Sequence, residues 1–171
     1  ITSSSESLIS KVKALRNYSQ SKKYHHDEIA FNRRLDAIQA AILSVKLPLL
    51  NKHNEQRIEA AKLYDDFLQN SKIIIPKVGE NRNHVYYAYV IQSQKRDELS
   101  NFLREDGIET GKHFPTSIHL QKAFYYLDYE EGSFPEAEKL SGRCLSLPIF
   151  PGITEEEIKY VSNKILEFER K

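Results

Sequence analysis

The spacing of apolar residues predicts helices over most of residues 1–70. Residues 3–17 and 35–70 carry apolar side chains every three or four positions, which is the period of an amphipathic helix. The polar stretch between them, residues 18–31, predicts a loop. Pro48 interrupts the second helical stretch, because proline lacks a backbone donor and clashes with the preceding turn. Either the helix kinks at Pro48 or a second helix begins there.

Beyond residue 70, short strands alternate with helices. Apolar and polar side chains alternate over residues 84–91, which predicts a strand. The other predicted strands are 73–75, 109–114 and 144–149, and the predicted helices are 95–106, 120–127, 133–142 and 154–171. The elements mix without long crossover connections. The pattern therefore predicts an α+β fold, with a small, mainly antiparallel sheet covered by helices.

Three of the predicted helices begin at a serine or threonine that is followed three positions later by glutamate. In such a capping box, the two side chains bond backbone N–H groups that the helix start leaves unpaired. The pairs are Ser3 with Glu6, Ser133 with Glu136, and Thr154 with Glu157. Each pair predicts where its helix begins.

The composition is that of a globular domain rather than a membrane or nucleic-acid-binding protein. Of the 171 residues, 40% are hydrophobic and 29% are charged, which is sufficient for one sizeable core. The 25 basic and 24 acidic residues give a net charge of +1, so no basic field indicates a nucleic-acid partner. The longest apolar runs are too short to span a bilayer. The single cysteine, Cys144, is compatible with a reducing cytoplasm, where we expect the protein to act.

The turn from loop to helix after residue 31 predicts an anion site. Asn32 and Arg34 stand where the first backbone N–H groups of a helix are unpaired and the helix dipole is positive, which favours phosphate. A simpler interpretation makes Asn32 the N-cap of the helix and Arg34 a surface charge. Both interpretations place Asn32 at the start of the helix.

Two histidines flank Phe114 and Pro115, where a predicted strand becomes a loop. His113 and His119 can each hydrogen-bond a sugar hydroxyl or a phosphate, or cap backbone groups of the turn. The histidines do not predict a metal site, because no His-x-x-x-His pair lies on a predicted helix and no second cysteine is present.

Several motifs follow one another in an order that is characteristic of a known family. Asn32-Arg33-Arg34-Leu35-Asp36, followed by Gln39-Ala40-Ala41, is similar to the pattern G-x-N-x-R-L-(D/S)-x-x-Q-A-A. Further matches are Arg57-x-x-x-Ala61-x-x-Tyr64, His84 to Val90, Gly107 to Pro115, His119 to Phe124, Phe134 to Glu138, and Leu145 to Pro148. Together they resemble the DegT/DnrJ/EryC1/StrS family, pyridoxal-phosphate (PLP) sugar aminotransferases of the aspartate-aminotransferase fold.

The resemblance implies a division of the chain. Residues 71–171 would form the family's small C-terminal α+β domain, and residues 1–70 a helical segment that links it to a large domain. Ile1-Thr2-Ser3 is similar to the tail of the G-G-x-x-x-T segment that follows the family's catalytic lysine. We therefore expect a C-terminal portion that holds no catalytic residue and is inactive alone.

The resemblance also implies a function. Such enzymes transfer an amino group, from a donor such as glutamate, to a keto group on a nucleotide-linked sugar, and they act as homodimers. Asn32 would donate to the PLP phosphate of the partner subunit, while Arg34, His113 and His119 would contact the substrate. Arg34 either binds a substrate phosphate or supports the loop through a carboxylate. Ala30 replaces the family's usual glycine, which would strain the loop if that position needed a positive φ.

Two alternatives remain open at the level of sequence. The protein could be a sugar dehydratase of the same family, in which histidine replaces the catalytic lysine. It could also be a free-standing interaction module without chemistry.

Overall fold

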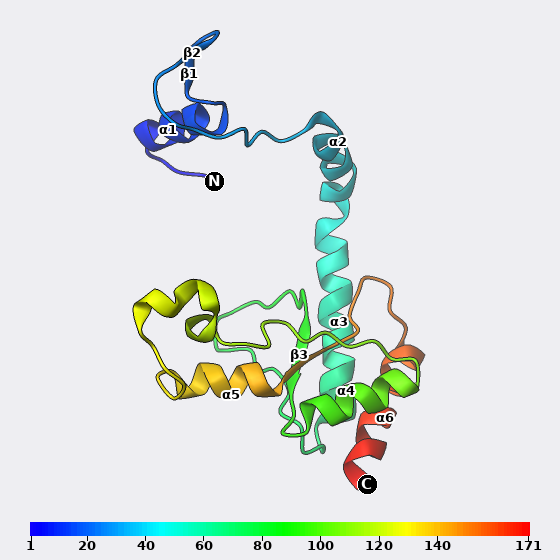
Figure 1. The fold of residues 1–171 in the computed structure, drawn as a ribbon. Coiled ribbons are helices and arrows are strands. Elements are labelled where there is room, and N and C mark those ends of the chain that lie inside the picture. The colour runs from blue at the N-terminus through cyan, green and yellow to red at the C-terminus, as the bar shows by residue number, and fades with distance from the viewer. The chain divides into compact units, whose positions relative to one another are not determined.

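A computed structural model describes residues 1–171, and its contacts divide them into two units, Ile1–Leu49 and Leu50–Lys171 (Figure 1). The first unit contains α1 (Glu6–Arg16), β1 (Gln20–Lys22), β2 (His25–His26), α2 (Ala37–Lys46) and the 3₁₀ turn η1 (Leu47–Leu49). The second unit contains α3 (Leu50–Leu68), β3 (Tyr89–Gln92), α4 (Arg96–Glu105), the 3₁₀ turns η2 (Ile118–Leu120) and η3 (Lys122–Leu127), α5 (Pro135–Arg143), β4 (Cys144–Leu147) and α6 (Glu155–Arg170).

The first unit contains a hairpin where the polar sequence predicted only a loop. β1 and β2 pair antiparallel, with Gln20 opposite His26. Tyr18, Ser19 and Tyr24 adopt positive φ angles of 59°, 45° and 69°. These residue types seldom occupy the left-handed region, so the hydrophobic pattern gave no indication of the turn.

The two helices of the first unit begin later than predicted. α1 is capped by Ser5, whose hydroxyl accepts from the Leu8 N–H, and the predicted pair of Ser3 and Glu6 forms no capping box. Asp36 stands at the N-cap position of α2, so the prediction that Asn32 caps this helix is wrong. Pro48 lies in η1, between α2 and α3, which confirms that proline interrupts the long helical stretch.

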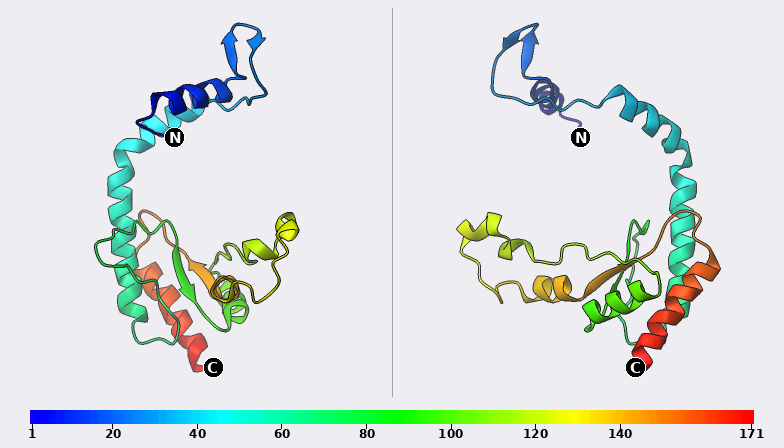
Figure 2. Two further views of the ribbon diagram at one scale, coloured as in Figure 1. Left: turned by 90° about the vertical axis from the view of Figure 1, so that its left-hand side faces the viewer. Right: turned by 45° about the vertical axis from the view of Figure 1, so that its right-hand side comes forward.

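The sheet of the second unit is small and antiparallel. β3 and β4 pair in a register that sets Tyr89 opposite Leu147. Single bridges add Ile74 beside Gln92 and Gly111 beside Ser146, so four short segments lie side by side. The alternate side chains Tyr89, Ile91, Leu145 and Leu147 are buried. They pack with α3, α4 and α6 in one hydrophobic cluster, and α3 and α6 lie against each other (Figure 2). The α+β class is confirmed.

All four predicted strands are shorter in the structure, and the strand predicted over 144–149 ends at Leu147. The strand predicted over 84–91 is formed only from Tyr89 onward, because Tyr86 has a φ of 46° that breaks the extended run. The predicted strands 73–75 and 109–114 are reduced to the single bridges at Ile74 and Gly111.

Helix starts in the second unit were predicted with mixed success. The box of Thr154 and Glu157 is confirmed, with both of its hydrogen bonds present at the start of α6. The cap predicted from Ser133 and Glu136 is wrong, since α5 begins at Pro135 without a side-chain cap. The predicted helix 120–127 is formed as the 3₁₀ turns η2 and η3.

The domain boundary predicted near residue 70 concerns a longer protein and stays a prediction. Within this chain the contacts divide at Leu49 and Leu50, because α3 contributes buried residues to the core of the second unit. None of the helices combines the length and the apolar character that a bilayer crossing requires.

Candidate functional site

The segment that carries Asn32 is fixed to the end of α1 by backbone hydrogen bonds. The Tyr18 N–H donates to the Phe31 oxygen at 2.9 Å, and the Arg33 N–H donates to the Arg16 oxygen at 2.8 Å. Asn32 itself forms an antiparallel bridge with Asn17. Asn32 therefore belongs to an extended segment held by backbone hydrogen bonds, four residues before the N-cap of α2. It lies too far from the start of α2 for the helix dipole to favour an anion there.

Arg34 orients the side chain of Asn32. The Arg34 Nε–H donates to Asn32 Oδ1 at 3.3 Å, and the guanidinium lies 5.7 Å from the centroid of the Tyr18 ring. The amide oxygen is thereby turned toward Arg34, while the exposed amide nitrogen makes no hydrogen bond within the chain. The Arg34 contacts are thus with an amide and an aromatic ring, and not with a carboxylate; whether Arg34 supports the loop or binds a substrate phosphate stays a prediction. Ala30 adopts no positive φ, so the loss of the family's glycine causes no strain there.

His113 lines a cavity of the second unit. The cavity measures about 380 Å³ and is lined by Arg57, Tyr87, Glu109, Gly111, His113 and Ser146, among others. The Nδ1 atom of His113 lies 2.8 Å from Ser146 Oγ, across the bridge that joins their two segments. The exposed imidazole is therefore anchored at one nitrogen, and its Nε2 makes no hydrogen bond within the chain.

Arg57 also lines this cavity, and the sequence indicated it only through the motif Arg57-x-x-x-Ala61-x-x-Tyr64. Its Nε is buried without a hydrogen-bond partner, while its Nη1 donates to the His53 oxygen at 3.4 Å. A buried guanidinium N–H without a partner is costly and suits an anionic ligand. Arg57 shares the buried face of α3 with Ala61 and Tyr64, at i+4 and i+7, and an arginine on an apolar face could have been noticed.

Stacked tyrosines support one wall of this cavity. Tyr64 and Tyr89 stack with ring centroids 4.8 Å apart, and the Tyr64 hydroxyl donates to the Pro148 oxygen at 2.9 Å. The Tyr89 hydroxyl donates to Asp65 Oδ1 at 2.6 Å. Burial raises the pKa of both phenols, and the nearby carboxylates of Glu157 and Asp65 raise it further. Both phenols therefore stay protonated and act in packing.

His119 lies outside this cavity and already has a partner. Its side chain is 7% exposed, and its Nε2 is 2.9 Å from Glu138 Oε1. Glu138 also accepts from the backbone N–H groups of Gly132 and Phe134. These two backbone bonds, and then His119, hold the pKa of the Glu138 carboxyl below its usual range. Contact between His119 and a substrate stays a prediction.

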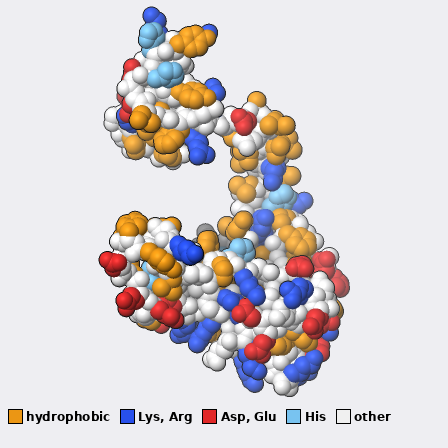
Figure 3. Space-filling view, viewed as in Figure 1, with side chains coloured by type: hydrophobic (Ala, Val, Ile, Leu, Met, Phe, Trp, Pro, Cys, Tyr) orange, Lys and Arg blue, Asp and Glu red, His pale blue; other side chains and the backbone are white.

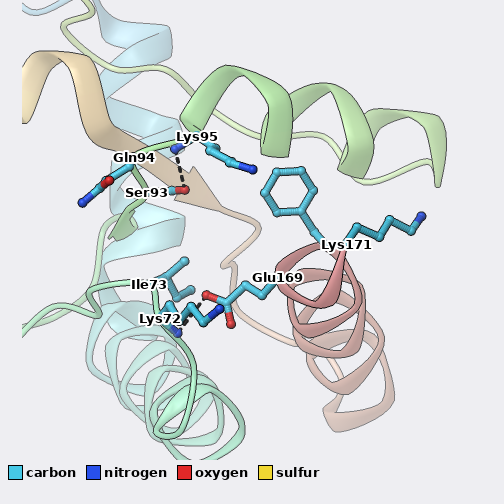
Figure 4. A pocket seen from close by; sticks show the side chains of 8 residues that line it. Lys72, Ile73, Ser93, Gln94, Lys95, Glu169 and Lys171 are labelled. Atoms are coloured by element: carbon cyan, nitrogen blue, oxygen red, sulfur yellow. Dashed lines mark hydrogen bonds between the residues drawn. The ribbon is translucent and has the colours of Figure 1, made fainter.

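A second hollow of about 320 Å³ contains several lysines but none of the predicted site residues (Figure 4). It lies between α6 and the segments around Lys72 and Lys95. Two of its side chains are engaged by backbone groups, because Glu169 accepts from the backbone N–H of Lys72 at 2.8 Å and Ser93 accepts from that of Lys95 at 3.2 Å. Each unit therefore has a candidate site of its own, at Asn32 in the first unit and around His113 in the second.

No cluster of three or more His, Cys, Asp or Glu side chains with a metal-binding arrangement occurs in the chain. Cys144 is half-buried, and burial raises the pKa of its thiol. A thiol that is held protonated is a poor nucleophile. The donors left for a ligand are thus amide, guanidinium and imidazole groups.

Comparison with known proteins places this architecture among the enzymes of aspartate-aminotransferase-like fold. DesV of S. venezuelae, solved in complex with a ketimine intermediate, superposes with a TM-score of 0.93 and 31% identity, covering 99% of this chain and 46% of that one. A DegT DnrJ EryC1 StrS aminotransferase from Brucella abortus superposes with a TM-score of 0.88 and 29% identity, covering 98% of this chain and 45% of that one. Residues 1–166 match the DegT/DnrJ/EryC1/StrS aminotransferase family, and the chain belongs to it.

The curated relatives agree with this assignment. A pleiotropic regulatory protein of Geobacillus stearothermophilus is 43% identical over 173 residues, covering 99% of this chain and 46% of the relative. The dTDP-3-amino-3,6-dideoxy-alpha-D-galactopyranose transaminase of Aneurinibacillus thermoaerophilus is 37% identical, covering 94% of this chain and 44% of the relative. The chain thus spans about half the length of the curated relatives that it matches.

Proposed function

We propose that this chain is the C-terminal portion of a PLP-dependent aminotransferase that acts on a nucleotide-linked keto sugar. Relatives that are named as dTDP-sugar and UDP-sugar aminotransferases support the substrate class. The observation that carries the proposal is the amide of Asn32, which Arg34 orients with its nitrogen unpaired and exposed. An oriented neutral donor suits a phosphate, because it bonds the dianion without burying another charge.

Asn32 would hold the phosphate of PLP, and we propose that it does so across a homodimer, on the partner subunit's cofactor. Once bound, the cofactor would supply the electron sink that the amino transfer requires. The work of this chain is to bind and orient. Arg34 keeps the Asn32 amide turned outward, and its remaining guanidinium N–H groups could still reach a substrate phosphate.

The cavity of the second unit would take part of the substrate. Arg57 brings a positive charge to its lining, and His113 has an exposed imidazole whose Nε2 makes no hydrogen bond within the chain. They suit phosphate oxygens or sugar hydroxyls. His119 would act behind this site, by fixing the segment around Phe134 through Glu138. Glutamate as the amino donor and a cytoplasmic location belong to the same proposal.

The relatives' names favour amino transfer over the alternatives. The transaminases among them are named for amino transfer on dTDP- and UDP-linked sugars, and not for the loss of water that a dehydratase catalyses. One relative has a name that states no enzymatic activity, pleiotropic regulatory protein. A non-catalytic module is the weaker candidate, because the other relatives named above are transaminases.

A covalent-labelling experiment tests whether the lysine that binds PLP lies outside this chain. None of the lysines stands in the context of the family's catalytic lysine, so we propose that residues 1–171 alone acquire no stoichiometric PLP adduct. The chain is mixed with PLP, reduced with borohydride and mapped by mass spectrometry. Scattered, substoichiometric labelling is expected. One fully labelled lysine together with transaminase turnover would overturn the proposal.

The substrate assignment is tested in a protein that joins this chain to the family's N-terminal portion. Incubation with glutamate and a UDP-linked or dTDP-linked 3-keto sugar should yield the amino sugar and 2-oxoglutarate. Release of water without consumption of glutamate would instead support the dehydratase.

A further inference from the structure

The His113 ring occupies a place that only glycine at position 111 leaves open. The Gly111 N–H donates to the Ser146 oxygen at 2.9 Å, and the Ser146 N–H donates to the Gly111 oxygen at 2.8 Å. A Cβ atom on Gly111 would stand 2.7 Å from Cε1 of His113 and 3.2 Å from its Nδ1. Gly111 has no positive φ, so the close approach of the His113 ring is the feature that favours glycine there, and a larger residue would move the ring.

The hydrogen-bond inventory of Ser146 decides which nitrogen of His113 carries the proton. Ser146 is 6% exposed, and the only hydrogen-bond partner of its hydroxyl is His113 Nδ1 at 2.8 Å. A serine hydroxyl has one proton to donate, and a buried proton without an acceptor is costly. If Nδ1 carried its own hydrogen, the Ser146 proton would be left without an acceptor. Ser146 therefore donates to Nδ1.

We propose that Ser146 is a positioning residue that fixes neutral His113 as the Nε2–H tautomer. The Nε2–H then faces ligand as a hydrogen-bond donor, and His113 does not act as a base toward it. Arg57 lines the same cavity, and its positive guanidinium makes the cavity suit an anionic or hydroxyl oxygen that accepts from His113 Nε2–H. The tautomer is argued from this chain alone, whereas the nature of the ligand rests on the proposed function.

The test is the ring-nitrogen NMR spectrum of the ¹⁵N-labelled chain 1–171, above the pH at which its histidines titrate. His113→Gln assigns the signals. We expect a protonated, pyrrole-like Nε2 and an Nδ1 that accepts a hydrogen bond, with NOEs from the ring to the Gly111 α-protons. Ser146→Ala should move Nδ1 toward the shift of a non-bonded nitrogen and weaken those NOEs, and Ser146→Thr should restore both.

Ser162→Ala is the matched control, since Ser162 is another buried serine of this unit and its hydroxyl makes no hydrogen bond to His113. It should leave the His113 signals unchanged. A wild-type ring protonated on Nδ1 overturns the proposal, and so does a Ser146→Ala spectrum identical to the wild type. The wild-type spectrum decides the tautomer even if a variant fails to fold.

Titration with uridine 5′-diphosphate separates the tautomer from the proposed ligand role. Binding should shift the His113 Nε2–H signal, and Ser146→Ala should weaken the affinity roughly 3- to 10-fold, the usual worth of one neutral hydrogen bond. If the free chain shows the Nε2–H tautomer but no nucleotide binds, the tautomer stands and the ligand role of the cavity fails.

Discussion

At the scale of single residues, Asn32 and Arg34 work as one group. The arginine donates to the amide oxygen, and the amide nitrogen makes no hydrogen bond within the chain. In a dimeric protein that contains this chain, Asn32→Ala should weaken PLP retention by about 1.5–3 kcal/mol, the usual worth of a hydrogen bond to a charged group. This corresponds to a roughly 10- to 150-fold higher dissociation constant, measured by equilibrium dialysis.

Asn17→Ala is the control for this experiment, because Asn17 pairs with Asn32 through the backbone and its side chain makes no hydrogen bond. PLP retention should be unchanged in that variant. Mixed dimers with a lysine-dead partner then show which subunit's Asn32 matters. If PLP retention is restored by the Asn32 of the same subunit that holds the cofactor, the proposal that Asn32 acts across the dimer interface is rejected.

Ser162, unlike Asn32, is a polar residue whose side chain has no hydrogen-bond partner. It lies on the buried face of α6, it is fully buried, and its hydroxyl has no hydrogen-bond partner. Removing such a hydroxyl relieves a desolvation cost. Ser162→Ala should therefore raise the free energy of unfolding by about 1 kcal/mol, measured by urea titration. A loss of stability of the same size would mean that the hydroxyl has a partner in solution.

At the scale of elements, Glu138 ties α5 to the segments before it. It accepts from two backbone N–H groups and from His119, which holds the pKa of its carboxyl low. A depressed folded-state pKa contributes stability above the unfolded value and loses it as the pH falls through the folded value. The contribution of Glu138 to the free energy of unfolding should therefore be complete at neutral pH. It should be lost below about pH 4, as the pH falls from the ordinary pKa of a glutamate carboxyl through the lower pKa of the folded state.

Glu138→Gln tests this sign. The variant should be less stable than the wild type at pH 7, and the difference should narrow on acidification, measured by urea unfolding at pH 7, 5 and 3. Glu136→Gln on the same helix is the control, because the Glu136 side chain is 82% exposed. A deficit that stayed constant down to pH 3 would show that shape, and not charge, matters at position 138.

The sequence predicted those elements whose cause is local. Thr154 and Glu157 form the capping box at the start of α6. The apolar residues that recur with helical spacing in α3, α4 and α6 are buried in the core, as their spacing predicted. The failures have non-local causes. The left-handed backbone of Tyr86 shortens β3, and backbone bonds from α1 hold Asn32 in an extended segment instead of at a cap.

For the candidate sites too, the sequence indicated residues of local motifs but not the contacts that folding creates. Family motifs included Asn32, Arg34, His113 and Ser146, and Arg34 was predicted to contact the substrate or support the loop. The contacts of Arg34 with the Asn32 amide and of Ser146 with His113 were not predicted, because spacing does not reveal them. Arg57 was quoted only inside a motif, since an unpaired buried nitrogen is visible only once the helix is packed. His119 was grouped with His113 by sequence, yet the fold gives it Glu138 as a partner.

At the scale of the whole molecule, the main unexplained feature is the apolar surface of α2. The helix has no buried residue, and its apolar side chains gather along it on the surface (Figure 3). Ile38, Ile42 and Val45 are 72%, 54% and 73% exposed. Contiguous apolar patches of more than a few hundred Å² are uncommon on monomers. In a longer protein of this family, we expect this face to pack on the large domain or on the dimer partner.

If that surface has no cover in the chain 1–171, the chain should self-associate. Sedimentation velocity should show concentration-dependent oligomers, and Ile42→Glu should shift them toward the monomer because a charge in an apolar contact is costly. Ser44→Glu adds the same charge to α2 without removing apolar surface, and it should leave the association largely intact. A strictly monomeric chain whose α2 amides exchange as slowly as those of β3 would show that the apolar face is satisfied within the chain. The need for a covering domain or partner would then disappear.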